Sequence, residues 1–327
     1  MESIDISLHK KFFEKLTKGL PEAAHSSYIT TLHFIVSALD ILNCNHLFPK
    51  QQLIDWVYSQ QLFTPGAEGF KPNGSLGGLE NTKWDYSTLA STYSALCILL
   101  VLGDDLSRVN KDLVVSSIAS LQKSDGSFNS HKDGLESDMR FVYCVCSICS
   151  ILDTWEGINL DKLENFILSC QSSLGSIGMG PGQEGHGGST YCGVTALFLM
   201  DRLHKLPLRE ELIEWLVQRQ GEGFQGRIGK MQDTCYGYWI GLTLQMLDAL
   251  DFVSYQNFYF YQECQFEAGG FSKYPQGSPD IVHSYLGLVS VSVLGHTGLK
   301  RVYGPLGISF EACKSVVKKP IRKLCVT

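Results

Sequence analysis

A glutamine followed by a glycine-rich turn recurs along this chain at an almost constant interval. Successive copies are separated by 49, 49 and 45 residues, and their glutamines are Gln122, Gln171, Gln220 and Gln265. Gln60 reads as an earlier copy, and the Gly/Pro-rich stretch 64–81, which we expect to be a loop insertion, accounts for its longer interval. A period in this range is typical of repeat architectures built from one supersecondary unit.

Each repeat contains two segments with different helical patterns. Before the glutamine lies an amphipathic segment, clearest in PLREELIEWLVQRQ, where the apolar residues of 208–217 fall on one face. After the turn comes a segment that is apolar on most sides and rich in small residues, such as STYCGVTALFLM and VHSYLGLVSVSVL. A helix that is apolar all round has to be buried. Outer helices with one solvent-exposed face are therefore expected to alternate with fully buried inner helices.

These helix pairs predict an all-α fold. We expect an α–α toroid, a closed barrel of about six pairs, that spans residues 1–327 as a single domain. An open solenoid is the alternative arrangement of such pairs. Closure is favoured because the inner segments are too apolar to line an open concave face. Residues 308–327 are expected to form a basic, solvated tail.

Composition argues against some classes of function. The chain has 27 Lys and Arg against 33 Asp and Glu, a net charge of −6, so no nucleic-acid partner is expected. No apolar run reaches the roughly 18 to 20 residues of a membrane span, so no stable membrane insertion is expected. The 11 cysteines lie mostly in apolar runs such as FVYCVCSICSIL, which is typical of reduced, buried thiols in a cytoplasmic protein.

Residues able to bind a metal recur where the turn enters the inner segment. His186 and Cys235 each lie 15 residues after their glutamine. Asp233 lies two residues before Cys235, and His283 lies 18 after Gln265. These entries meet at one rim of a closed ring, where Asp233, Cys235 and His283 form a plausible zinc site with an open fourth position. The alternative is that Cys235 and His283 are ordinary core residues.

Cationic residues stand just upstream of these candidate ligands. Arg227 and Lys230 suit a diphosphate, with His186 at the matching rim position and a hydroxyl from Tyr236. The alternative is a solvated basic turn. The aromatic residues of the inner segments either line an apolar funnel or form plain core, and they are Phe34, Tyr143, Tyr191, Tyr238, Trp239 and Tyr285.

Several longer motifs resemble the β subunits of protein prenyltransferases. They are LVLGDDLSRVNKD, SDMRFVYC, GHGGSTYCG, DTCYGYW and GGFSKYP…PDIVHSYLG, and they look most like the type I geranylgeranyl branch of that family. The resemblance runs over about residues 10 to 295. It implies an α–α toroid that works as a heterodimer with a prenyltransferase α subunit.

The resemblance also implies roles for individual residues. The zinc ligands would be Asp233, Cys235 and His283, and the diphosphate would lie on His186, Arg227, Lys230 and Tyr236. The isoprenoid pocket would include Trp239, Tyr143 and Cys192. The substrate peptide would contact Glu136, Arg140, Phe34 and Val282. Around the reacting atoms, the catalytic set would be Asp233, Cys235, His283, Lys273 and Tyr236.

Two positions distinguish the branches of the family. Thr30 stands where the farnesyl enzyme has a tryptophan that closes the pocket floor, so the smaller side chain leaves room for one more isoprene unit. Lys273 stands where the farnesyl and Rab-type enzymes have an aspartate, and its ammonium can neutralise the diphosphate that magnesium would bridge. A departure from the family pattern is Thr88, which replaces a histidine of the group that holds the substrate C-terminus.

The implied activity is transfer of geranylgeranyl from geranylgeranyl diphosphate to the cysteine of a C-terminal Cys-a-a-X motif with Leu or Phe at X. The implied cofactor is one Zn²⁺ per β subunit, without a requirement for magnesium. The implied substrates are CaaX proteins such as small GTPases. The alternatives are a farnesyltransferase or Rab geranylgeranyltransferase β subunit, and a non-catalytic helical repeat scaffold.

Overall fold

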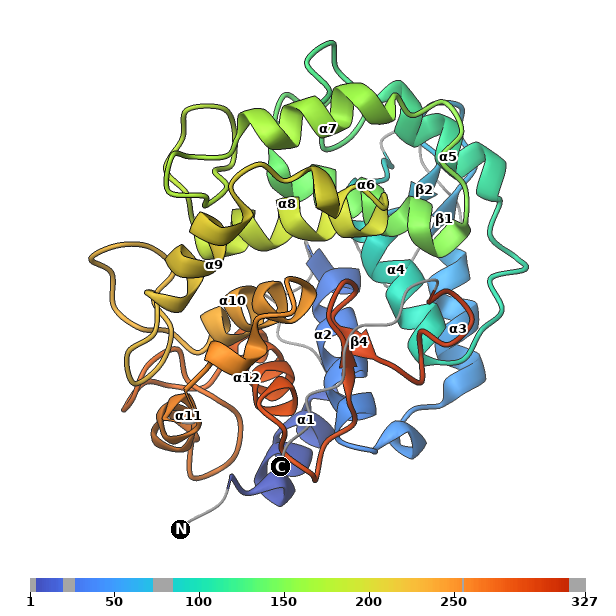
Figure 1. The fold of residues 1–327 in the computed structure, drawn as a ribbon. Helices are drawn as coiled ribbons and strands as arrows, with labels where there is room; N and C mark the ends of the chain where they lie inside the picture. The colour runs from blue at the N-terminus through green and yellow to red at the C-terminus, as the bar shows by residue number, and fades with distance from the viewer. Residues whose placement is uncertain (1–3, 20–26, 73–84, 255, 318–327) are drawn as a thin grey trace.

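Outer and inner helices alternate along the chain in the computed structural model, which describes residues 4–19, 27–72, 85–254 and 256–317 (Figure 1). The outer helices are α1 (Ile6–Leu16), α3 (Lys50–Ser59), α5 (Lys111–Ser120), α7 (Leu160–Ser169), α9 (Arg209–Val217) and α11 (Asn257–Cys264). The inner helices are α2 (Tyr28–Ile41), α4 (Leu89–Val101), α6 (Met139–Leu152), α8 (Gly187–Leu199), α10 (Cys235–Met246) and α12 (Ile281–Val293). Short 3-10 helices lie at η2 (Asn45–Leu47), η3 (Leu203–Lys205) and η4 (Leu250–Phe252).

The inner helices form a closed ring. Each packs against the next inner helix in chain order, and α12 packs back against α2 (Figure 1). Each outer helix packs on the inner helix that follows it, from α1 on α2 to α11 on α12. The architecture is therefore the predicted α–α toroid, and the open solenoid is ruled out.

Burial explains the two layers. Almost every residue of α4 is buried, and its polar residues Ser91 and Thr92 satisfy their hydroxyls against the backbone of Phe70. The outer helix α7 buries only one stripe, which includes Leu163, Phe166 and Ile167. Full burial of such an apolar side chain stabilises the fold by about 1.5–3 kcal/mol, so the inward face decides where each helix lies.

The recurring glutamines join each repeat to the next one. The side-chain amide of Gln122 donates to the Asn159 carbonyl at 3.0 Å and accepts the Asn159 N–H at 2.8 Å, just before α7 begins. Gln220 does the same ahead of α11, with the Phe252 carbonyl and the Ser254 N–H. The side chain thus satisfies backbone groups that a helix start leaves unpaired.

Gln265 closes the ring with this same contact. Its side-chain oxygen accepts the N–H of Asp5 at 2.8 Å, and Asp5 is the N-cap of α1. The last repeat therefore holds the first outer helix as though it were the next repeat. Gln60 is the exception, because its side-chain amide donates within its own helix to the Trp56 carbonyl.

Glycine is required where these repeats touch. Gly126 has a φ of +95°, and a Cβ on it would collide with the backbone of Lys162 in α7. Gly269 has a φ of +90°, and a Cβ on it would collide with the backbone of Leu8 in α1. Each turn therefore needs glycine both for its left-handed backbone and for the close approach of the next outer helix.

Two predicted irregular segments are partly ordered. Within the 64–81 insertion, β2 (Gly69–Phe70) pairs with β1 (Gln61–Leu62), while residues 73–81 lie outside the described part of the chain. The predicted tail, 308–327, begins with β4 (Ile308–Ser309), which pairs with β3 (Val302–Tyr303). β4 packs against the inner helices α2 and α4, and β3 packs against α12. Residues 318–327 lie outside the described residues.

The start of the predicted tail is therefore not solvated. Ile308, Ser309 and Cys313 are each 0% exposed. The basic residues that suggested a tail, such as Lys314, lie after this buried segment. The described cysteines are free thiols, and most are buried. Among the described helices, we find none with both the length and the apolar character needed to cross a membrane.

Candidate functional site

Asp233, Cys235 and His283 meet where two inner helices begin. Asp233 lies just before α10, Cys235 is its first residue, and His283 is in the first turn of α12. One possible ligand atom from each residue lies within 4.8 Å of the others. The similar register of the repeats therefore does bring these residues together at one rim, as the sequence predicts.

Hydrogen bonds fix the orientation of each of these side chains. Asp233 Oδ1 accepts the N–H of Cys235 at 2.8 Å and lies 3.4 Å from His283 Nε2. On the other side of the imidazole, Nδ1 lies 2.6 Å from Asp280 Oδ2. Asp280 is also the N-cap of α12, because its side chain accepts the N–H of His283. Asp280 was not among the residues predicted from the sequence; the spacing of an N-cap three residues before a candidate ligand would have indicated it.

The electrostatics of this cluster are those of a site built for a cation. Burial, and then the Asp233 carboxylate, raises the pKa of the Cys235 thiol well above its usual value. Burial lowers the pKa of His283, but hydrogen bonds to Asp233 and Asp280 outweigh it and raise the pKa to about 9. Burial raises the pKa of Asp233, yet its bonds to His283 and Cys235 leave it below the usual value. Protein partners thus hold a proton where a metal ion would supply the positive charge.

The donor set fits zinc. A carboxylate, a thiol and an imidazole are three of the ligand types that Zn²⁺ takes, and three protein ligands leave one tetrahedral position for substrate. Asp280 would act as the outer partner that fixes the His283 tautomer, since its carboxylate accepts the hydrogen on Nδ1 and leaves Nε2 free to bind the ion.

A group of cationic and polar side chains borders the cluster. Lys273 Nζ lies 3.6 Å from Asp233 Oδ2, and the Lys273 side chain is 55% exposed. Arg227 pairs with Glu184 at 2.8 Å, and both side chains are partly exposed. Lys230 lies on the same exposed turn, with its N–H bonded to the Arg227 carbonyl. These cations are accessible to an anionic ligand at the rim.

His186 is oriented by the helix that it caps. Its Nδ1 accepts the N–H groups of Gly188 and Ser189 at the start of α8. Nδ1 therefore carries no hydrogen, and Nε2 faces the Tyr236 hydroxyl at 3.4 Å. Burial, and then the neighbouring Arg227 charge, lowers the pKa of His186. A neutral His186 can donate a hydrogen bond from Nε2 to an anion.

Gly226 allows the cationic turn to pass over Tyr236. A Cβ at this position would collide with the Tyr236 ring, and the Gly226 carbonyl accepts the N–H of Gly187 at 2.8 Å. The turn thus links the starts of α8 and α10. Sequence reasoning missed this residue, because its requirement arises from a contact between two repeats.

The aromatic residues predicted to line a funnel lie on the inner helices. Trp239 is partly exposed and packs edge-on against Tyr191, with ring centroids 5.2 Å apart. Phe34 is partly exposed and stacks on Tyr285, also at 5.2 Å. Thr30 is half-buried in α2, where its hydroxyl accepts from Ser94 at 3.3 Å. Most of these aromatic residues are buried core, whereas Trp239 and Phe34 are partly exposed, so the funnel stays a prediction.

The other predicted isoprenoid residues lie deeper. Tyr143 and Cys192 are 7% and 5% exposed, so both are buried on the inner helices α6 and α8. Val282 is 42% exposed at the rim, next to His283.

The predicted peptide-binding pair lies on the rim at the start of α6. Arg140 contacts Asp138 at 2.6 Å and Glu136 at 4.0 Å, and both Arg140 and Glu136 are more than half exposed. Thr88 has a structural role at the start of α4, where its hydroxyl accepts the N–H of Ser91 in a capping box. Thr88, which the resemblance places at the position of a family histidine, is therefore a helix N-cap in this chain.

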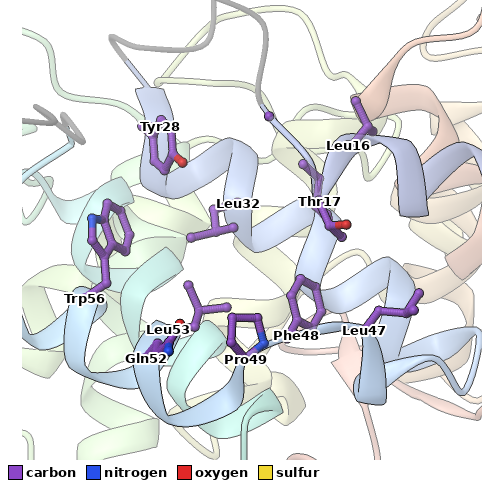
Figure 2. A pocket seen from close by; sticks show the side chains of 12 residues that line it. Leu16, Thr17, Tyr28, Leu32, Leu47, Phe48, Pro49, Gln52, Leu53 and Trp56 are labelled. Carbon is purple, nitrogen blue, oxygen red and sulfur yellow. The ribbon is translucent and has the colours of Figure 1, made fainter.

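A separate apolar pocket of about 360 Å³ lies between α1, α2 and α3, outside the ring (Figure 2). Its walls include Leu32, Phe48, Leu53 and Trp56, and none of the described residues that line it is charged. None of the predicted site residues lines it. The cluster at the rim, with its converging donors and cations, therefore remains the candidate site.

Comparisons with known proteins agree with this architecture. Residues 4–310 match the family described as the prenyltransferase alpha-alpha toroid domain. The geranylgeranyl transferase type-1 subunit beta of Arabidopsis thaliana is 36% identical, over 94% of this chain and 90% of that protein. The subunit of the same name from Dictyostelium discoideum is also 36% identical, over 92% and 94% of the two chains. A solved structure of Candida albicans protein geranylgeranyltransferase-I complexed with GGPP superposes with a TM-score of 0.88 at 26% identity, covering 96% of this chain and 98% of that one.

Proposed function

This chain belongs to the prenyltransferase α–α toroid family, and from that premise we propose that it is the catalytic β subunit of a type I protein geranylgeranyltransferase. The observation that supports the proposal is the meeting of a zinc-type donor set with accessible cations at one rim, beside partly exposed aromatic side chains of the inner helices. Two relatives with the name geranylgeranyl transferase type-1 subunit beta align with nearly the whole chain.

The proposed reaction is S-alkylation of a protein cysteine. The sulfur of a C-terminal Cys-a-a-X motif forms a bond to C1 of geranylgeranyl, and the bond from C1 to the diphosphate oxygen breaks. The diphosphate leaves with the electron pair, and the thiol proton passes to solvent. A zinc ion held by Asp233, Cys235 and His283 would supply the positive charge that keeps the substrate sulfur ionised.

The chain's own residues position the reactants. Arg227, Lys230 and Lys273 neutralise charge on the diphosphate, and His186 Nε2 and the Tyr236 hydroxyl donate hydrogen bonds to it. Because charge develops on the leaving oxygen, donors aimed at it stabilise the transition state. Trp239 and its aromatic neighbours bind the isoprenoid by burying apolar area and exclude water from the reacting carbon.

We propose that magnesium is not required. Lys273 holds its ammonium 3.6 Å from Asp233, at the boundary between the zinc-type cluster and the cationic rim. A fixed ammonium there can neutralise the diphosphate without a second ion. We also propose that Thr30 selects the C20 chain, since a threonine occupies less of the funnel than a large aromatic side chain.

The partners follow from the same proposal. The family works as an αβ pair, so we propose an obligate prenyltransferase α subunit and CaaX proteins ending in Leu or Phe as substrates. The exposed Arg140 and Glu136 at the rim are proposed to help hold the substrate's C-terminus. A cytoplasmic location stays a prediction, supported by the free thiols of the described cysteines.

The decisive experiment is a competition between prenyl donors. The chain is co-expressed with a prenyltransferase α subunit and given geranylgeranyl and farnesyl diphosphates together with a Cys-a-a-Leu peptide in magnesium-free buffer. Selective C20 transfer is the expected result. Selective C15 transfer would favour the farnesyl branch instead. A heterodimer that binds no zinc and transfers neither lipid would favour a non-catalytic scaffold.

A further inference from the structure

Each inner helix contributes one aromatic ring to a closed girdle inside the toroid. In chain order the members are His33, Tyr93, Tyr143, Tyr191, Tyr238 and Tyr285. The ring centroids of neighbouring members lie 5.2 to 6.3 Å apart, and Tyr285 returns to His33 at 5.9 Å. All members are at most 8% exposed. The girdle is therefore a complete ring of buried side chains inside the toroid.

The turn of the C-terminal hairpin, residues 304–307, is bonded to this girdle. Every carbonyl of the turn accepts a tyrosine hydroxyl from a different inner helix. Tyr191 donates to Gly304 at 2.7 Å, Tyr93 to Leu306 at 2.8 Å and Tyr285 to Gly307 at 2.8 Å. The Tyr143 hydroxyl shares its one hydrogen between the Tyr93 hydroxyl at 2.8 Å and the Pro305 carbonyl at 3.3 Å. The hydroxyls thus join the ring of helices to the hairpin.

The hairpin has little freedom to move. Gly307 has a φ of +69°, and a Cβ at this position would collide with the Tyr238 hydroxyl. Leu306 is 1% exposed, and the N–H groups of Leu306 and Gly307 both bond to the Tyr303 carbonyl. A buried network in which every member is satisfied rigidifies its surroundings. The turn is therefore a fixed support for the tyrosine rings.

The girdle contacts the proposed isoprenoid funnel through Trp239. The Trp239 ring packs on Tyr191 at 5.2 Å and on Tyr238 at 4.6 Å. Tyr93 and Tyr143 are the most exposed members of the girdle, at 8% and 7%. Their hydroxyls are linked in series, because Tyr143 donates to Tyr93 at 2.8 Å and Tyr93 donates to the Leu306 carbonyl.

We propose that the hairpin turn 304–307 is a specificity-determining element that sets the greatest length of prenyl chain the funnel accepts. Resting on the function proposed above, this inference makes the tyrosines positioning residues. The turn holds their hydroxyls, the hydroxyls hold the rings, and the rings form a floor that stops the far end of the lipid. A floor without these bonds can yield to a longer chain.

The test replaces girdle tyrosines with phenylalanine, which removes the hydroxyl groups and keeps the aromatic rings. In the αβ heterodimer, Tyr93→Phe combined with Tyr143→Phe is compared with wild type, using C15, C20 and C25 prenyl diphosphates and a Cys-a-a-Leu peptide. We expect the ratio of kcat/KM for C25 over C20 to rise roughly three- to tenfold, the range that the net free energy of one hydrogen bond corresponds to. A purely structural weakening would lower all three values in proportion.

The matched control is Tyr58→Phe. Tyr58 also loses a hydroxyl bond, to Asp104 at 2.6 Å, but it lies on the outer helix α3. Its C25/C20 ratio is expected to stay at the wild-type value. Dissociation constants of the three lipids, measured without peptide, give a readout that does not need turnover. If the double variant does not assemble with the α subunit, the C25/C20 ratio of kcat/KM is measured on the Tyr143→Phe heterodimer instead.

The outcomes separate this inference from the function on which it rests. A wild-type heterodimer that binds none of the three lipids would overturn the proposed function. A wild type that transfers C20, with C25/C20 ratios unchanged in the Tyr→Phe variants, would overturn the role of the turn alone.

Discussion

The Asp233 carboxylate lies 3.4 Å from the imidazole of His283, although the two residues belong to different repeats. They meet because each comes at the same point of its repeat, where a turn enters an inner helix, and because α10 packs against α12. A closed ring turns this repeated register into a row of side chains along one rim. The site is thus a consequence of the repeat spacing.

The first prediction concerns the zinc-type cluster. Cys235→Ala removes one of three donors, so we expect bound zinc to fall from about one per heterodimer to near zero. Prenyl transfer should fall by about a thousandfold or more, because the substrate sulfur is no longer held ionised. Elemental analysis of the purified heterodimer and single-turnover transfer measure the two effects. Cys170→Ala, which removes a buried thiol at the end of α7, is the matched control. Full zinc content in the Cys235 variant would contradict the assignment.

The second prediction concerns Lys273. Lys273→Ala should lower the rate of C20 transfer by roughly 10- to 1,000-fold, because a cation that stabilises the leaving diphosphate is lost. Lys273→Asp should be as slow in magnesium-free buffer but should recover when millimolar magnesium is added. Titration of magnesium against single-turnover rate distinguishes the two variants. Equal magnesium responses in wild type and both variants would mean that Lys273 does not replace the ion.

The third prediction concerns Thr30. Thr30→Trp should lower the C20/C15 ratio of kcat/KM by about tenfold or more, since one isoprene unit of space is filled. Thr30→Val is the matched control, because it removes the hydroxyl that faces Ser94 but keeps the size of the side chain. Its ratio should match that of wild type. A tryptophan variant that slows both lipids equally would indicate a general packing defect instead.

Repeat spacing and helix pattern were enough to predict the toroid. The spacing of Gln122, Gln171, Gln220 and Gln265 located the repeats, but it did not indicate what the glutamines do. Their side chains join consecutive repeats, and Gln265 joins the last to the first. That contact crosses between repeats, so no local pattern contains it. The buried hairpin was missed for a related reason, since a short apolar stretch before basic residues resembles the start of a tail.

The candidate site was also predicted only in part from the sequence. Register predicted that Asp233, Cys235 and His283 would meet, because similar offsets place residues at similar heights in a ring. It did not predict Asp280, whose carboxylate orients His283, or Gly226, whose missing side chain makes room for Tyr236. The requirement for Gly226 arises from a tertiary contact, so it appears only in the folded chain. The Asp280 cap is a local contact, and its spacing from His283 could have indicated it.

The last prediction concerns His33, the member of the girdle that is not a tyrosine. It is 2% exposed, and among the described residues neither ring nitrogen has a hydrogen-bond partner. Burial lowers its pKa to about 3, well below the usual 6.5. The unfolded chain therefore binds a proton in the window between these values, where the folded chain does not. Stability is present above pH 6.5 and is lost as the pH falls, by about 2 kcal/mol between pH 7 and pH 5.

His33→Phe removes this titration and the unpaired nitrogens, so we expect two effects. The variant should lose less stability than wild type between pH 7 and pH 5, and at neutral pH it should be at least as stable, because a buried polar group without a partner is gone. Melting temperatures at both pH values measure the difference. His46→Phe, at an exposed position on η2, should keep the wild-type pH dependence. Equal losses in wild type and His33→Phe would show that His33 has a partner that satisfies it in either charge state.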